Sequence, residues 1–531
     1  MKTENKYPYD LQAIRNYGIE KWFSEFQSVL HPKVFQKYYQ VIFKVFSKIM
    51  EKRGESSSVY WSGVVHYKIS RNLSLGLFRF EMLNSLKQKG FECLIKAGNI
   101  VSIDTEKKKV RDDLCKVIYR HYIFSDENLK ETLRLLKINF SSCGLKNTIK
   151  CLKPDFNNCV IADPEDAYVK AFCSEKKISP MCLRTALLMP SEKELSAFLE
   201  NPDAKVFIDE LFNGIIKELP ESKVFFDDKV RKYYTSLFIN TVKSFELLCE
   251  KFKKHKLGTL LLESLTNAEA RLPAAVWKYC GGQVIGFAHG NAYLTCIGGS
   301  DETNGTHLVL TDFVVTSKGE ADNLKHLRSI LPSSLNGNDR ILTLKKDFYA
   351  NIRKKEIKID NNLEISNVMI VGFPMDNFYY PGLPSHDAMT YAHLTFQIMK
   401  DLKKAGYKIL YKAHPDTLNE SEGVFDSYAD EIITEGFEKV YEKADCILFP
   451  SPYSTTFGFT VMTDKPIVYM RNQEWNYEPP LLTKLLHQRS VPVAVKLNAS
   501  AVLEYDSRNL LEAIKISKKR MNTEVIEKFA K

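Results

Sequence analysis

Residues 366–470 show a regular exchange between short apolar runs and longer stretches with helical periodicity. Short apolar runs bounded by turn residues are typical of strands buried on both faces of a parallel sheet. The pattern predicts strands at Val368–Gly372, Lys408–Ala413, Glu431–Thr434, Cys446–Phe449 and Pro466–Met470, with helices at His386–Ala405, Phe437–Lys443 and Thr455–Thr463. Strands that alternate with helices indicate a doubly wound parallel sheet.

The first half of the chain has the same character but is less regular. We predict strands at Val59–Tyr67, Val117–Ile123, Cys159–Ala162, Thr259–Glu263, Gln283–Ala288 and Leu308–Thr316, with a helix at Asn267–Tyr279. Residues 125–255 read largely as helices, and part of them is a candidate insertion that shapes an acceptor site. The chain is therefore predicted to belong to the α/β class.

The length supports two domains, because 531 residues exceed what one hydrophobic core usually holds. We predict a helical N-terminal extension at 1–55, a first α/β domain at 56–335 that includes the helical insertion, a second α/β domain at 336–506, and a C-terminal helix at 507–531.

The extension contains an amphipathic pattern with two interpretations. Five lysines from Lys33 to Lys52 fall on one helical face, and apolar residues from Phe35 to Ile49 fall on the opposite face. A helix packed on a domain with its lysines in water has this pattern, and so does a helix that lies on an anionic membrane. The sequence leaves both open.

The net charge indicates the kind of binding partner, and the cysteine content indicates the cellular compartment. Lysine and arginine number 75 against 65 acidic residues, and this net charge of +10 suits nucleotide-sugars, phosphorylated glycans or an anionic membrane. No basic tract with interleaved aromatic residues predicts nucleic-acid binding. The 11 cysteines form no Cys-x-x-Cys pair and no zinc spacing, which predicts reduced cysteines in the cytoplasm. We see no signal peptide or membrane-spanning run, so we expect a soluble protein or one peripheral to the inner face of the cytoplasmic membrane.

Two turns that follow predicted strands of the second domain carry the candidate chemistry. The first contains His414 and Pro415, and the second contains Ser454, Thr455 and Thr456. Functional residues in open α/β sheets lie just beyond the carboxyl ends of the strands. An imidazole and the hydroxyls at a helix start can donate hydrogen bonds to one phosphate. A histidine that caps its own turn and a serine that caps a helix would explain the same residues.

The Lys-Ala-His-Pro turn at 412–415 and the Ser-Thr-Thr turn at 454–456 resemble the HP and S/T motifs of bacterial glycosyltransferases with the GT-B fold. The resemblance covers residues 255–480. Those enzymes use CMP-activated acidic sugars, sialic acids and Kdo, in capsule and lipopolysaccharide synthesis, and the teichoic-acid CDP-glycerol transferases are similar in the same region. The resemblance implies two Rossmann-like domains that face a cleft, and a C-terminal helix that crosses back to the first domain.

The resemblance also implies roles for residues of the second domain. It places a nucleotide phosphate against His414, Pro415 and Lys412 and against the hydroxyls at 454–456, with His414 stabilising the departing phosphate. It places the base and ribose against the turn that contains Gly372 and Pro374. A strand-end lysine in water and a simple tight glycine turn are the alternatives.

Two turns of the first domain supply candidates for the reacting carbon and the acceptor. The turn at 286–291 resembles the HG turn of capsule-synthesis transferases, which implies that His289 contacts the donor or the acceptor. Glu263 ends a predicted strand and is a candidate general base or nucleophile. A buried capping histidine and a solvated acid are the alternatives. The rival acids are Asp301, Glu302, Asp209 and Glu210, the last two in a loose echo of the acidic motif of bacterial sialyltransferases with a different spacing.

The sequence contains no Asp-x-Asp after a predicted strand, so we expect neither a metal nor a cofactor. A CMP leaving group carries one phosphate, which histidine and hydroxyls can stabilise. We therefore predict a metal-independent glycosyltransferase that moves a Kdo-like or sialic-acid-like sugar from a CMP-sugar to a bacterial surface glycan or lipid-linked glycan. Transfer of glycerol or ribitol phosphate from a CDP donor is one alternative. A non-catalytic nucleotide-sugar-binding subunit of a glycan assembly complex is another.

Overall fold

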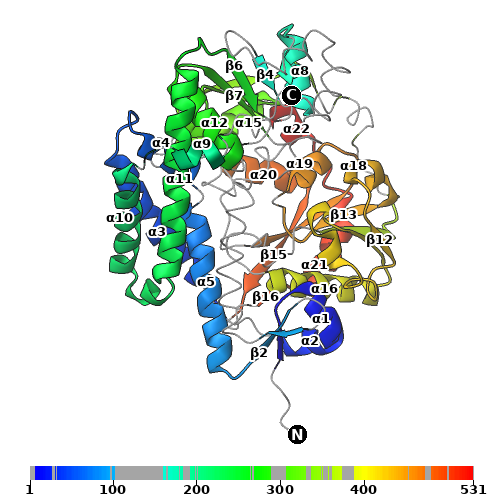
Figure 1. The fold of residues 1–531 in the computed structure, drawn as a ribbon. Helices are drawn as coiled ribbons and strands as arrows, with labels where there is room; N and C mark the ends of the chain where they lie inside the picture. Colours follow the sequence, from blue (N-terminus) through cyan, green and yellow to red (C-terminus); the bar gives the residue numbers. More distant parts are fainter. Residues whose placement is uncertain are drawn as a thin grey trace.

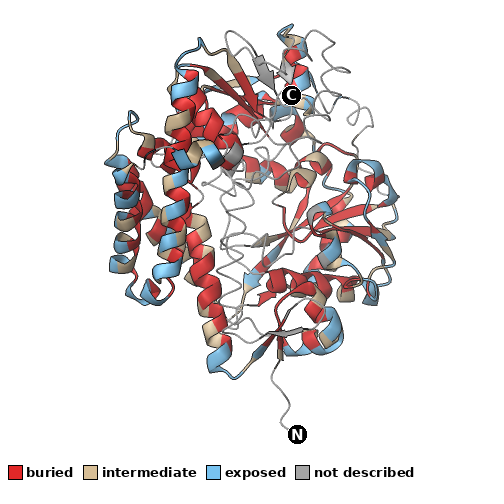
Figure 2. Ribbon diagram, viewed as in Figure 1, coloured by how far each residue is buried: buried red, intermediate tan, exposed pale blue. Residues whose placement is uncertain are grey.

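The structure is a computed structural model that describes residues 6–26, 30–31, 33–67, 69–95, 99–101, 160–162, 166–178, 180–182, 190, 192–197, 199, 201–262, 265, 268–288, 307–329, 337–347, 350, 357, 362–372, 388–452, 454–472, 480–498 and 502–529. Two parallel sheets lie in separate halves of the molecule, each with helices against it (Figure 1). The strands of both sheets consist largely of buried residues where burial is described (Figure 2).

The first sheet has six parallel strands in the order β5-β4-β6-β7-β8-β9. They are β4 (Val160–Ala162), β5 (Met181–Cys182), β6 (Thr259–Leu262), β7 (Gln283–Phe287), β8 (Asp312–Val315) and β9 (Arg340–Thr343). Helices α11 (Asp228–Phe252) and α12 (Ala268–Tyr279) share one core with residues of this sheet, and α8 (Ala167–Glu175) shares another. Because apolar side chains cover both faces, the strands appear in the sequence as continuous apolar runs.

The second sheet has seven strands in the order β12-β11-β10-β13-β14-β15-β16, parallel except for the last pair. They are β10 (Asn367–Val371), β11 (Lys408–Lys412), β12 (Glu431–Ile433), β13 (Cys446–Phe449), β14 (Ile467–Asn472), β15 (Val491–Leu497) and β16 (Leu503–Glu504). Numbered along the chain, the first six strands have the Rossmann order 3-2-1-4-5-6.

Helices cover both faces of the second sheet. One face packs on α16 (Ala388–Lys404) and α21 (Ser507–Ser517), and the other on α18 (Phe437–Val440), α19 (Thr455–Val461), α20 (Pro480–Arg489) and α22 (Glu524–Phe529). The predicted α/β architecture with two doubly wound parallel sheets is therefore confirmed, and it is the architecture of the GT-B fold. Because β9 pairs with β8, the first domain extends beyond the predicted boundary at residue 335.

The strand predicted at Val59–Tyr67 is wrong, because these residues form most of helix α4 (Ser58–Val65). The Ser57 hydroxyl caps this helix by accepting a hydrogen bond from the backbone of Val59, 3.2 Å away. A Cβ at Gly63 would lie 2.3 Å from the Met50 sulfur, so the neighbouring helix packs closely against this glycine. An apolar run that is buried on all sides gives no periodicity to separate a strand from a helix.

Other differences concern the ends of elements and short strands. The prediction of a strand from Leu308 is too long, because residues 307–309 form a helical turn and β8 begins at Asp312. The prediction omitted β5, β9, β15, β16 and the small sheet formed by β1 (Lys6–Pro8), β2 (Glu92–Ile95) and β3 (Asn99–Val101). The strand predicted at Val117–Ile123 lies outside the residues that the structure describes.

The amphipathic helix of the extension is α3 (Lys33–Glu51), and its apolar face is packed. Phe35, Tyr38 and Ile42 are buried in one core with α5 (Ile69–Gln88) and α10 (Pro202–Glu218), while Lys37 and Lys44 are exposed. This packing confirms the first interpretation of the pattern and leaves that apolar face no access to a membrane. Among the described residues, no helix is long and apolar enough to span a bilayer.

Both ends of the chain cross between the halves. Helices α1 (Leu11–Tyr17) and α2 (Ile19–Glu25) pack on the second domain, although α3 packs on the first. At the other end, α22 contacts α15 (Lys318–Ser329) of the first domain. Figure 1 shows this last helix beside α15, while Val525 and Ile526 keep it in the core that covers one face of the second sheet. The single helix predicted at 507–531 is wrong, because the structure has two helices there, α21 and α22. The second makes the crossing to the first domain that the GT-B resemblance implied.

Candidate functional site

The candidate residues of the second domain converge where the strand order of its sheet reverses. The chain enters the sheet at β10, proceeds outward to β11 and β12, and then returns to β13 on the other side of β10. Ligands of doubly wound sheets bind outside the carboxyl ends of the strands at such a reversal. Gly372 follows β10, His414 follows β11, and Ser454 follows β13 after a short turn, so all three lie at this edge.

The His414 turn is compact and well bonded. The backbone N–H of Ala413 donates to the Ile433 carbonyl at 2.9 Å, which continues the sheet one residue beyond β11. The His414 carbonyl then accepts from the N–H of Thr417 at 3.2 Å and closes a turn of 3₁₀ helix at Pro415–Thr417. His414 itself is half-buried. The turn therefore fixes the backbone of a histidine that remains partly accessible at the sheet edge.

Lys412 is not the solvated strand-end lysine that the sequence offered as an alternative. Its side chain is buried, and its Nζ donates to the Ala413 carbonyl at 2.6 Å. Burial lowers the pKa of Lys412, while Glu438 and Glu435 act in the opposite direction. The amine braces the chain from within, immediately before His414, and its predicted contact with a phosphate remains a prediction.

Ser454 caps helix α19, as its alternative interpretation proposed. Its Oγ accepts from the N–H of Phe457 at 3.1 Å. That bond uses an oxygen lone pair, so the hydroxyl proton can still be donated. Thr455 and Thr456 are partly exposed beside it. Because α19 has only seven residues, we assign any anion binding here to the hydroxyls and first N–H groups rather than to a long helix dipole.

Gly372 is explained by packing between strands. Its N–H donates to the Lys412 carbonyl at 2.8 Å, and a Cβ would lie 2.7 Å from the Tyr411 hydroxyl oxygen and 3.0 Å from that carbonyl. The absence of a side chain at Gly372 thus makes room for β11, and its predicted contact with the base or ribose remains a prediction. Pro374, the other residue predicted against the base and ribose, lies outside the residues that the structure describes.

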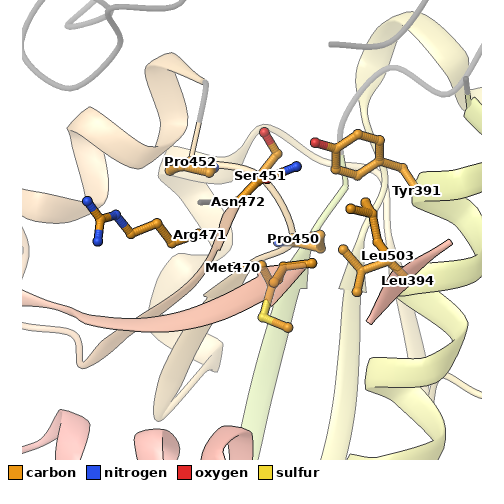
Figure 3. A pocket seen from close by; sticks show the side chains of 10 residues that line it. Tyr391, Leu394, Pro450, Ser451, Pro452, Met470, Arg471, Asn472 and Leu503 are labelled. Atoms are coloured by element: carbon orange, nitrogen blue, oxygen red, sulfur yellow. The ribbon is translucent and has the colours of Figure 1, made fainter. Parts of the chain in front are cut away.

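A pocket lies at the same edge of the sheet, outside the ends of β13 and β14. The residues that line it are Tyr391, Leu394, Pro450, Ser451, Pro452, Met470, Arg471, Asn472, Val495 and Leu503. Figure 3 shows the hydroxyls of Tyr391 and Ser451 at one rim, above the apolar side chains of Leu394, Met470 and Leu503. The enclosed volume of this pocket is 20 Å³, which is room for about one water molecule and not for a ring-shaped ligand.

The prediction missed the polar residues of this pocket. Ser451 lies in the same turn as the predicted hydroxyls at 454–456. Arg471 and Asn472 directly follow the strand predicted to end at Met470, and a polar pair after an apolar run at this edge was the available signal. Tyr391 had no such signal, because it lies within a helix and only the tertiary structure brings it to the pocket.

The first-domain candidates remain predictions. Glu263, His289, Asp301 and Glu302 lie outside the residues that the structure describes. The strands that lead to Glu263 and His289 are neighbours, because β6 pairs with β7 and the two end at Leu262 and Phe287.

The two rival acids that are described lie away from this sheet. Asp209 and Glu210 are part of α10, which packs on α3 and α11. Glu210 makes an ion pair of 3.0 Å with Arg53. The structure therefore does not bring these two acids to the carboxyl edge of the first sheet.

The described part of the first domain has a buried carboxyl group that the prediction missed. Glu320 is 1% exposed, and its Oε2 accepts from the backbone N–H of Thr316, the residue after β8, at 2.8 Å. Its own N–H donates to the Ser317 hydroxyl at 3.2 Å, which completes a capping box at the start of α15. Burial raises the pKa of Glu320 to about 7, although the hydrogen bonds from Thr316 act in the opposite direction. A Ser-x-x-Glu sequence was the signal that could have located it.

A second polar cluster lies at the opposite edge of the first sheet. His307 Nδ1 and Arg328 contact the same carboxylate oxygen of Asp339, at 2.8 and 2.7 Å. Burial lowers the pKa of His307, while Asp339 acts in the opposite direction. Because Asp339 precedes β9, this cluster ties α15 to the start of that strand and is remote from the carboxyl edge. Among the described residues, no group of three His, Cys, Asp or Glu side chains could hold a metal ion.

Comparisons with known proteins give only distant similarities. No protein-family model matches the chain, and no curated protein matches it significantly. The chain is similar to a solved structure of UDP-GlcNAc 2-epimerase from Methanocaldococcus jannaschii, with 12% identity, a TM-score of 0.29 and coverage of 55% of this chain and 79% of that chain. It is also similar to a structure of UGT89C1 from Arabidopsis thaliana complexed with UDP, with 14% identity and a TM-score of 0.33. That similarity covers 69% of this chain and 86% of that chain. TM-scores this low do not establish a fold. The fold assignment therefore rests on the strand order of the two sheets.

Proposed function

We propose that the protein is a nucleotide-sugar glycosyltransferase whose donor binds at the carboxyl edge of the second sheet. One observation carries the proposal. The His414 turn, the hydroxyl turn that begins with Ser454 and the pocket rimmed by Tyr391 and Ser451 all adjoin the reversal of strand order in that sheet. A phosphate bound by the two turns would be one part of a nucleotide donor.

The proposed donor is a CMP-activated acidic sugar, and the proposed acceptor is a bacterial surface glycan. The resemblance of the two turns to the HP and S/T motifs supports this donor class. The net charge of +10 and the presence of Arg471 at the pocket also suit an anionic donor. Transfer from a CDP-linked polyol would use the same His414 and Ser454, so it is the competing outcome of the binding test.

In the proposed reaction, the bond between the anomeric carbon and the phosphate oxygen breaks and CMP leaves. His414 and the Ser454 hydroxyl donate hydrogen bonds to the phosphate oxygens, on which negative charge develops. The acceptor oxygen bonds to the anomeric carbon, and its proton passes to a base, for which Glu263 is the proposed residue. A covalent intermediate on the same carboxylate is the retaining variant of this route.

Calorimetric titration with CMP, CDP and UDP tests the proposal, in EDTA and again in Mg²⁺. We expect CMP to bind best and about equally in both. The change His414→Ala should weaken CMP binding by about 1.5–3 kcal/mol, the value of a charge-assisted hydrogen bond. Arg508→Gln, at a side chain that is 91% exposed in the same domain, is the matched control and should bind like wild type.

Four results would contradict the proposal. Preference for UDP or a strict need for Mg²⁺ would reject the donor class. Preference for CDP would favour the polyol-phosphate alternative. Unchanged CMP binding by His414→Ala would remove the phosphate site on which the function depends.

A further inference from the structure

Helix α1, near the start of the chain, packs against the short helix that follows the His414 turn. The side-chain amide of Gln12 donates to the carbonyls of Asn419 at 3.3 Å and Glu422 at 2.9 Å. These residues belong to and immediately follow the short helix α17 (Leu418–Ser421). The last carbonyls of a helix have no partner within it, so a donor from another element holds that end in place. Gln12 therefore joins the N-terminal segment to α17.

Short bonds connect α17 to His414. The Ser421 hydroxyl donates to the Thr417 carbonyl at 3.0 Å, and the Thr417 N–H donates to the His414 carbonyl at 3.2 Å. Thr417 is 2% exposed, so it has little room to move alone. A displacement of α17 is consequently passed to the backbone of His414.

The residue after this segment is shaped to receive α1. Gly423 has a φ of +69°, a left-handed conformation that side chains other than glycine rarely adopt. A Cβ at this position would lie 2.5 Å from Cζ of Arg15, so the absence of a side chain also makes room for the guanidinium. The backbone of the turn and the surface of α1 are thus complementary at a second point.

The N-terminal segment is itself held at both ends. We call residues 6–26 the strap. At its beginning, β1 pairs with β2, the strand that follows α5 of the first domain. At its end, the ring of His393 on α16 stacks between Phe23, with centroids 4.5 Å apart, and Phe26, 4.9 Å apart. Because both ends are fixed, α1 between them has a defined position relative to α17.

We propose that the strap positions the His414 turn for phosphate binding and that Gln12 is the positioning residue. This inference rests on the proposed function, because it gives His414 the phosphate contact. Gln12 does not contact the ligand; it holds α17, and α17 holds the turn. The strap also makes donor binding on the second domain sensitive to the first domain, through the pairing of β1 with β2.

The test compares isosteric variants of the full chain by CMP titration. Gln12→Glu keeps the shape but replaces the amide donor with an acceptor that repels the two carbonyls. We expect Gln12→Glu and Gln12→Ala to weaken CMP binding about three- to tenfold, the effect of one or two lost hydrogen bonds. Glu20→Gln is the matched control, since it removes the charge from an exposed 2.7 Å contact between the strap and Lys400 of α16 without touching α17. It should change CMP binding less than about twofold.

A second readout follows the turn without any ligand. The imidazole signals of His414, assigned in NMR spectra by their loss in His414→Ala, should move in Gln12→Glu and stay in Glu20→Gln. If Gln12→Glu leaves those signals and CMP affinity unchanged while His414→Ala loses CMP, the positioning role is overturned and the proposed function stands. If His414→Ala binds CMP like wild type, both are overturned.

Discussion

At the scale of single residues, burial decides which interpretation of a motif holds. Lys412 and Gly372 belong to motifs that suggest ligand contacts, yet one braces the chain before His414 and the other makes room for Tyr411. Ser454 caps α19 and still has a hydroxyl proton to donate. A structural role and a binding role are therefore compatible for a hydroxyl that both accepts and donates.

Glu320 provides a prediction on stability. Burial raises its pKa from 4.5 to about 7, so its contribution to stability is full below about pH 4.5 and is lost as the pH rises through 7. Glu320→Gln removes the charge and keeps an oxygen that can accept from Thr316. We compare the free energy of unfolding of wild type with that of Glu320→Gln. The advantage of wild type should fall by on the order of 2–3 kcal/mol between pH 4.5 and 8. Urea unfolding at the two pH values checks this, and an unchanged difference would show that Glu320 ionises as readily in the folded chain as in the unfolded one.

At the scale of elements, the same amphipathic or apolar pattern serves different neighbours. The apolar face of α3 is packed on α5 and α10, and α4 is buried around its whole circumference. Helices α1 and α2 pack on the second domain, although only a short segment separates them from α3. An element's periodicity thus specifies that a face is covered, and the tertiary fold specifies what covers it.

Docking of α2 is predicted to depend on pH. Burial lowers the pKa of His393 to about 4 from 6.5, with Lys400 acting in the same direction and Glu504 in the opposite one. The stability from this contact is therefore full above about pH 6.5 and is lost as the pH falls through 4. Hydrogen exchange of residues 19–25, corrected for the intrinsic effect of pH, should show loss of protection in this range. His393→Phe keeps an aromatic ring between Phe23 and Phe26 and should abolish that loss.

At the scale of the whole molecule, the two sheets are joined by more than the link between β9 and β10. The strap connects α5 of the first domain to α16 and α17 of the second, and α22 returns from the second domain to α15. These crossings tie the two domains together at both ends of the chain. A division of labour follows from the proposed function, with the donor phosphate on the second domain and the proton transfer on the first.

Kinetics can test this division. Glu263→Gln should leave CMP affinity nearly unchanged and lower turnover by about 100-fold or more, because a general base acts mainly in the transition state. His414→Ala should instead weaken CMP binding and also slow turnover. The measurement is one CMP titration and one rate for each variant. Normal turnover in Glu263→Gln would transfer the role of the base to Asp301 or Glu302.

Much of the second domain could be predicted from the sequence. Its buried strands read as short apolar runs, and those at 408–412 and 446–449 were placed to within a residue. The His414 and Ser454 turns were placed at the carboxyl edge for the same reason, since a residue that follows a parallel strand lies at that edge wherever the strand is in the sheet. Local periodicity and turn residues contain this information, because they reflect which faces of one element are buried.

What the sequence alone determined is therefore the type of most elements and the edge at which their turns lie. The tertiary structure decided the strand order that brings β10 between β11 and β13, the enclosure of Lys412, and the arrival of Tyr391 at the pocket. It also decided that Gln12 reaches the carbonyls behind the His414 turn. These features depend on contacts between residues far apart in the chain, and no local pattern encodes such contacts because many arrangements bury the same apolar faces equally well.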